Sequence, residues 1–123
     1  MANPFLDSAF TIRWSQLTPE LMAPAIDAAL ERAQAAVDAL AAREPAAADY
    51  PNTFLALERA TEELTVAWGK ITHLQSVADS PALREAHNAL LPKVAAFYAK
   101  IPLNAGLWQR LNPVAQTPAA RAL

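Results

Sequence analysis

The sequence of 123 residues contains no cysteine and only two glycines and two histidines. Without cysteine the chain forms no disulfide bond and no thiolate metal site, and a reducing compartment suits it. Two isolated glycines exclude a glycine-rich phosphate-binding loop. They also leave a hairpin-rich β fold without the residues that its tight turns require. These shortages argue against several common protein classes before any motif is considered.

Clusters of basic residues and long apolar runs are missing as well. The net charge is −2 at pH 7, and the lysines and arginines are scattered singly, whereas nucleic-acid binders gather them on one patch or helix. No apolar run reaches the length of about 18 residues that spans a bilayer. The first residues lack the basic and apolar segments of a signal peptide. We therefore expect a cytoplasmic protein with no nucleic-acid partner and no membrane association.

Alanine is the commonest residue, and hydrophobic residues make up 54% of the chain. Alanine has the highest helix propensity, and a chain of this length suffices for one domain with a modest core. Prolines recur between the apolar stretches and divide the chain into segments. The composition therefore predicts an all-α protein.

The longest periodic stretch runs from Asp49 to Pro81 and predicts one long amphipathic helix, with Asp49 as its cap. Apolar residues recur there at steps of three and four, which places them on one face. We expect this helix to organise the fold, and we place Lys70 on its exposed side. Trp68 is predicted to lie where three long helices meet. The predicted core consists of Leu57, Leu64, Trp68 and Ile71 from this helix, with Leu90, Val94 and Phe97 from the next.

Proline and cap signals delimit the other predicted helices. Thr18 and Pro19 mark a helix start, and Pro45 stops that helix. Ser80 caps a third helix, which Pro92 should bend, and Asn104 caps a short fourth. Because short connections make neighbouring helices antiparallel, residues 18–112 are predicted to form an antiparallel bundle of three long helices plus a short fourth. Residues 113–123 are predicted to form a loosely ordered tail.

Residues 1–17 show a different pattern. Phe10, Ile12 and Trp14 alternate with polar residues, which is typical of an extended segment. Since no second strand is predicted to pair with it, we interpret the segment as an extended N-terminal arm laid across the helices, with its aromatic side turned inward.

The two histidines do not have the spacing of a helical zinc site. Such a site uses two histidines four residues apart, but Val77 follows His73 at that distance and Leu91 follows His87. His87 lies on an apolar stripe and is interpreted as a core or boundary residue. His73 lies on the flank of its helix, where an interface contact is the alternative to a solvated side chain. We therefore predict no metal ligand in this chain.

No constellation of catalytic residues is found either. The densest acidic cluster comprises Glu58, Glu62 and Glu63, with Arg59 among them. Two carboxylates divide acid and base roles only where burial separates their pKa values, so we interpret this cluster as a solvated helix face. No catalytic residue and no bound cofactor is predicted.

Several short stretches form a recognisable pattern in their order and spacing. They are Asn3 to Leu6, Pro19-Glu20, Pro24 to Ile26, Asn52 to Glu58, Trp68, His73-Leu74, Ser80 to Ala86 and Asn88 to Pro92. Together they resemble the N-terminal region of the thimet oligopeptidase family, which includes oligopeptidase A and dipeptidyl carboxypeptidase. In this family a histidine follows a Pro-Glu pair, but here Leu21 takes its place, so no role of that histidine carries over.

The resemblance implies the N-terminal helical part of a zinc metallopeptidase. Family members are several times longer and cut short peptides in a channel between two mostly helical halves. Their zinc site, a His-Glu-x-x-His helix with a later glutamate, lies downstream of this region and is absent here, so zinc is implied only for full-length relatives. The resemblance leaves two alternatives: a fragment of a peptidase that supplies a channel wall, or a stand-alone helical protein-interaction module derived from that family.

The resemblance also implies that part of the apolar surface contacts a partner. In relatives this region packs against several hundred further residues, so part of its apolar surface is expected to face a neighbour. The candidate interface residues are Phe10 and Trp14 on the arm and Trp108 on the short helix. We expect the partner to be the remainder of a metallopeptidase chain or another copy, most simply in a two-fold homodimer.

Overall fold

The chain folds into helices joined by short turns, and the computed structural model describes residues 2–44 and 48–123. Three 3-10 turns, η1 (Pro4–Leu6), η2 (Trp14–Gln16) and η3 (Pro19–Leu21), precede the α-helices. These are α1 (Met22–Ala41), α2 (Phe54–Val77), α3 (Pro81–Lys100), α4 (Ala105–Ala115) and α5 (Pro118–Arg121). Every regular element within the described ranges is helical, so the prediction of an all-α fold is confirmed.

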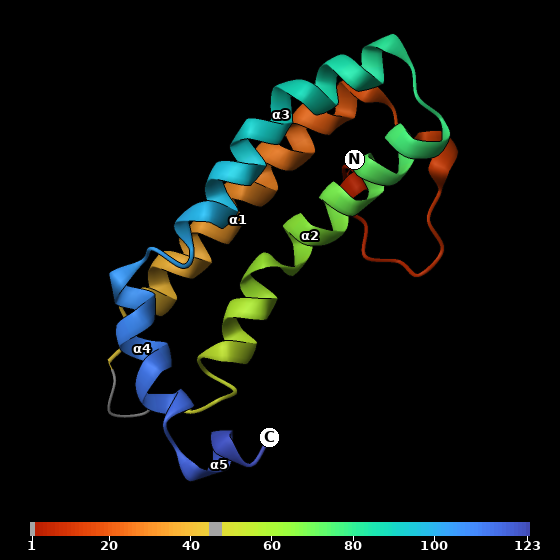
Figure 1. The fold of residues 1–123 in the computed structure, drawn as a ribbon. Coiled ribbons are helices and arrows are strands. Elements are labelled where there is room, and N and C mark those ends of the chain that lie inside the picture. Colours follow the sequence, from red (N-terminus) through yellow and green to blue (C-terminus); the bar gives the residue numbers. More distant parts are fainter. Residues whose placement is uncertain (1, 45–47) are drawn as a thin grey trace.

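Helix α1, rather than α2, is the element around which the others are arranged. It contacts α2, α3 and α4 as well as the turns η1 and η3. Figure 1 shows α2 running opposite to α1 and α3, with α4 following at the far end of α3. Buried Ala25, Ala29 and Ala33 line α1, and such small side chains let neighbouring helices approach closely. Alanine carries little hydrophobic signal, which explains why the sequence pattern pointed to α2 instead.

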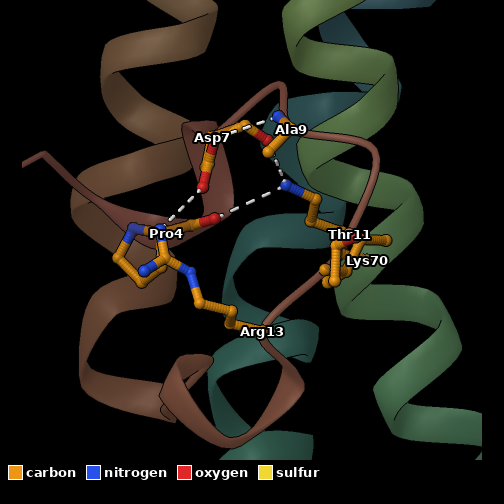
Figure 2. A pocket seen from close by; sticks show the side chains of 7 residues that line it. Pro4, Asp7, Ala9, Thr11, Arg13 and Lys70 are labelled. Carbon is orange, nitrogen blue, oxygen red and sulfur yellow. Dashed lines mark hydrogen bonds and ion pairs between the residues drawn. The ribbon is translucent and has the colours of Figure 1, made fainter.

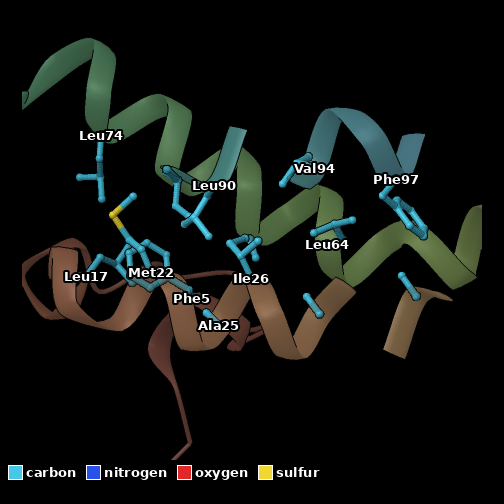
Figure 3. Packing of buried hydrophobic residues seen from close by; sticks show 14 of the residues in the cluster. Phe5, Leu17, Met22, Ala25, Ile26, Leu64, Leu74, Leu90, Val94 and Phe97 are labelled. Atoms are coloured by element: carbon cyan, nitrogen blue, oxygen red, sulfur yellow. The ribbon is translucent and has the colours of Figure 1, made fainter. Parts of the chain in front are cut away.

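The core lies where α1, α2 and α3 meet the N-terminal arm (Figure 3). Of the predicted core residues, Leu64 and Ile71 are fully buried, and Leu90, Val94 and Phe97 are buried as well. Leu57 and Trp68 are only partly buried and pack against the edge of the core. The expectation that Trp68 lies at the meeting point of three helices is therefore wrong. Its indole instead lies over the His87 ring of α3, with ring centroids 5.0 Å apart.

The start of α2 differs from the predicted one. Asp49 and Asn52 exchange hydrogen bonds, each side chain accepting from the other's backbone N–H at 2.8 Å. The Thr53 hydroxyl donates to the Asp49 carbonyl, and α2 begins at Phe54. Asp49 therefore closes a turn before the helix, because its side chain is used by Asn52 rather than by a helical N–H.

The other helix starts follow local rules to different degrees. Ser80 accepts from the Leu83 N–H and Asn104 accepts from the Leu107 N–H, as expected of caps. Thr18 makes no capping hydrogen bond and precedes η3 rather than α1. Helix α3 continues through Pro92. The predicted stop at Pro45 lies outside the described residues.

The C-terminal segment is more ordered than expected. Helix α4 continues through Pro113 to Ala115, and Val114 is buried. Thr117 then accepts from the Ala120 N–H and caps α5. Residues 113–123 are therefore largely helical, which differs from the predicted loose tail. Across the described ranges, no helix is long and apolar enough to cross a membrane.

Candidate interaction surface

Lys70 fastens the N-terminal arm to α2. Its side chain is only 4% exposed, although the helical pattern predicted an exposed residue. The ammonium Nζ donates to the carbonyl oxygens of Asp7 at 2.7 Å and Pro4 at 3.4 Å (Figure 2). It also donates to the Phe5 carbonyl oxygen at 3.1 Å. An ammonium has three protons to donate, so each meets an acceptor, which is what a buried charge requires.

The first part of the arm is coiled rather than extended. Asn3 accepts from the Phe5 N–H at 3.0 Å, and its Nδ2 donates to the Leu21 carbonyl at 2.9 Å. These bonds shape η1, whose carbonyls Lys70 then binds. Phe5 is fully buried in the core. The prediction of an extended arm is therefore wrong here, because a turn was needed to present several carbonyls to one ammonium.

Asp7 shapes the next part of the arm. One carboxylate oxygen accepts from the Ala9 N–H at 2.9 Å, and the other pairs with Arg13 at 3.2 Å. The hydrogen bond from Ala9, and then the one from Arg13, lower the pKa of Asp7. The hollow beside Lys70 measures about 10 Å³, which suits about one water molecule. This part of the arm is thus a structural joint and not a ligand pocket.

The aromatic residues of the arm do not turn inward as predicted. Phe10 is fully exposed, and Trp14 is 40% exposed. The Trp14 ring packs against His73 of α2, with centroids 5.0 Å apart. The bonds of Lys70 and Asp7 hold the chain before this point, and the residues that follow loop away from the helices near the C-terminal end of α2 (Figure 1). Ile12 alone of the alternating residues packs against the core.

The side of α2 that faces away from the core carries a second series of residues at steps of three and four. We call this series the α2 outer stripe. Val66 and Val77 on it are 46% and 66% exposed. Between its first half and the arm lies a shallow groove of about 390 Å³, which is lined by Leu6, Ser8 and Arg59 among others. The α2 outer stripe consists of Glu58, Glu62, Val66, Gly69, His73 and Val77, and all of them are exposed.

A second exposed apolar region lies at the opposite end of α2. Trp108 of α4 is 64% exposed and Leu103 is 83% exposed. A mostly apolar depression of about 470 Å³ lies between Tyr50 and the C-terminal residues Val114 and Leu123. Figure 1 places α4 and α5 far from the arm. The structure thus exposes all three candidate interface residues but does not bring Trp108 together with Phe10 and Trp14.

The two histidines pack against aromatic rings. His73 packs against Trp14, and His87 is buried beneath Trp68 with its Nδ1 3.3 Å from the Asn88 side chain. In residues 2–44 and 48–123, no three histidine, aspartate or glutamate side chains are placed to hold a metal ion.

The acidic cluster lies on the surface of α2. Glu63 forms an ion pair with Arg32 of α1 at 2.8 Å, and Glu58 and Glu62 are exposed. Exposure keeps these carboxylates solvated. Lys70 and its carbonyl partners were missed by the sequence reasoning, because no local signal links residues more than sixty positions apart.

These features define an all-α module with exposed apolar surface at both ends of its second helix. The profile of the neurolysin/thimet oligopeptidase N-terminal domain matches residues 25–123. The chain therefore belongs to this family, which confirms the resemblance described above.

The chain is also similar to oligopeptidases from bacteria and plants. It is 33% identical over 108 residues to oligopeptidase A of Salmonella typhimurium, covering 88% of this chain and 16% of that protein. It is 26% identical over 118 residues to a probable cytosolic oligopeptidase A of Arabidopsis thaliana, covering 95% of this chain and 16% of the relative. The chain thus spans about a sixth of the length of the curated relatives it matches. No solved structure matches it significantly.

Proposed function

We propose that this chain is the N-terminal helical wall of a zinc-dependent oligopeptidase that cleaves short peptides, and that the zinc site and the catalytic residues belong to another part of that enzyme. The observation that carries the proposal is the family match over residues 25–123. The relatives named oligopeptidase A are about six times longer, which leaves most of such an enzyme to the catalytic part.

The surface of the chain supports a role in packing against a larger neighbour. Val77, Leu103 and Trp108 are each more than 60% exposed, and Phe10 is fully exposed. These residues form exposed apolar regions at the two ends of α2. Exposed apolar patches on a protein surface are typical of protein interfaces. In an oligopeptidase, a rigid helical wall would restrict the channel to short peptides.

One observation favours the alternative of a stand-alone interaction module. The core is closed within the chain, since Phe5, Leu64 and Ile71 are fully buried without a partner. A core that is closed within the chain suits a module that acts without the rest of the enzyme. A coding sequence that continues past Leu123 into a His-Glu-x-x-His motif would exclude this alternative.

The proposal is tested in two preparations. The isolated chain should contain no stoichiometric zinc and should not cleave a fluorogenic peptide, because the described residues offer no set of metal ligands. A chimera in which this chain replaces the matched 108-residue region of Salmonella oligopeptidase A should bind zinc and cleave the same peptide. Tight zinc and chelator-sensitive activity in the isolated chain would refute the proposal, as would a folded, zinc-loaded chimera without activity.

A further inference from the structure

The two glycines of the chain have opposite environments. A Cβ added to Gly106 would lie 3.0 Å from the Ala41 Cβ and 3.2 Å from the Ala41 carbonyl oxygen. Gly106 is therefore required where α4 packs against α1. A Cβ added to Gly69 would meet no atom within 4 Å, and neither glycine has a positive φ. Nothing in the described chain accounts for a glycine at position 69.

A glycine in the middle of a helix that no contact within the chain explains indicates a contact with another backbone. Glycine destabilises a helix interior relative to alanine, and its usual advantage in such a place is the close approach of another backbone. Gly69 lies in the middle of the α2 outer stripe, between exposed Val66 and the Trp14–His73 pair. The absent Cβ and the apolar neighbours together form a place where a second helix would fit closely.

The charge along the stripe indicates how such a helix is oriented. Glu58 and Glu62 at its beginning form no ion pair with any described residue, whereas Glu63 is paired with Arg32. Arg59 offsets one of the two free carboxylates, so this end carries about one net negative charge. The other end holds Val77, whose exposed side chain is apolar. A complementary helix therefore carries a basic residue at one end and apolar residues along its middle.

We propose that a helix from the catalytic part of the oligopeptidase packs across the α2 outer stripe, crossing α2 at Gly69 and placing a basic residue beside Glu58 and Glu62. This inference rests on the proposed function, since it identifies where the rest of the enzyme docks. It assigns the main interface to α2 rather than to Trp108 on α4.

The test compares Gly69→Leu with a matched control, Ala36→Leu on the exposed side of α1. In the isolated chain, Gly69→Leu should leave the melting temperature unchanged or raise it, because open space surrounds the site. In the chimera with Salmonella oligopeptidase A, the same substitution should lower the melting temperature and reduce peptide hydrolysis at least tenfold. Ala36→Leu should leave the melting temperature of both preparations and the peptide hydrolysis of the chimera unchanged.

The outcomes separate this inference from the proposed function. An active chimera that Gly69→Leu leaves unaffected would overturn the docking face while the proposed function stands. An isolated dimer that Gly69→Leu converts to a monomer would also overturn it, because a second copy would then occupy the stripe.

If the unsubstituted chimera itself lacks zinc and activity, the docking face is tested on the isolated chain by nuclear magnetic resonance. The probe is a synthetic alanine–leucine helix with lysines at one end. It should shift the amide signals of Val66, Gly69 and Val77, and its glutamate counterpart should not. Absence of these shifts with the lysine helix would overturn the inference.

Discussion

The residues on the two faces of α2 differ in whether packing within this chain explains them. On the inner face Leu64, Ala67 and Ile71 are fully buried against the rest of the core. On the outer face Val66 and Val77 remain exposed, and Gly69 has open space around it. The inner residues follow from the need to bury apolar area, whereas the outer residues have no such reason within this chain. The inner face therefore explains the fold of this chain, whereas the outer face is the one for which we propose a contact with another helix.

The largest expected effect tests the inner face. Ile71→Ala should lower the free energy of unfolding by about 2–5 kcal/mol, since it removes buried methyl groups and leaves a cavity. The matched outer substitution, Val66→Ala, should change it by less than about 1 kcal/mol. Urea denaturation measures both. Equal midpoint shifts for the two variants would show that the faces of α2 are not distinct.

The next effect concerns the residue that ties the arm to α2. Lys70→Met keeps the length of the side chain but leaves three carbonyl oxygens without their donor, which should cost about 1–3 kcal/mol. Lys93→Met is the control, because Lys93 forms an exposed pair with Asp27 and such pairs contribute at most about 1 kcal/mol.

Limited proteolysis provides a second measurement on the same variants. Lys70→Met should release the arm and speed cleavage after Phe10, whereas Lys93→Met should not. If both lysine variants are cleaved at the rate of the parent chain, Lys70 does not hold the arm in place.

Substitution of the two glycines by alanine should change the stability of the isolated chain in opposite directions. Gly69→Ala should raise the stability of the isolated chain by up to about 1 kcal/mol, the usual difference between these residues in a helix. Gly106→Ala should lower it by about 1–3 kcal/mol, because the new methyl group would press on Ala41. Thermal unfolding of both variants measures these changes in stability. A loss of stability in Gly69→Ala would mean that this chain itself needs the glycine.

The sequence predicted interactions between residues close together in the chain, but not those between residues far apart in it. Ser80 and Asn104 were recognised as caps because a cap bonds a residue three positions ahead. The all-α class followed from composition and period. The bonds of Lys70 could not be predicted, since they join a side chain to backbone carbonyls more than sixty positions away.

The candidate interface was predicted only in part. The aromatic residues of the arm were noticed, but their direction depends on the Asp7 turn and on Lys70, which only the folded chain reveals. The α2 outer stripe was not recognised, because two valines among charged residues do not stand out beside the stronger stripe on the inner face. Whether Phe10, Trp14 or Trp108 contacts a partner stays a prediction.

The smallest expected effect concerns the arm beside the outer face. Because the Ala9 N–H and Arg13 lower the pKa of Asp7 in the folded chain, its ionised form favours the folded arm. That contribution is present above the ordinary pKa of an aspartate and is lost as the pH falls through the lowered folded value. The amide signal of Ala9, followed by nuclear magnetic resonance during acid titration, should therefore move only below the pH at which a free aspartate titrates. Asp7→Asn should abolish this movement. A midpoint at or above the ordinary aspartate value would show that the turn does not hold Asp7 in solution, and the arm would then be free to leave the outer face of α2 open along more of its length.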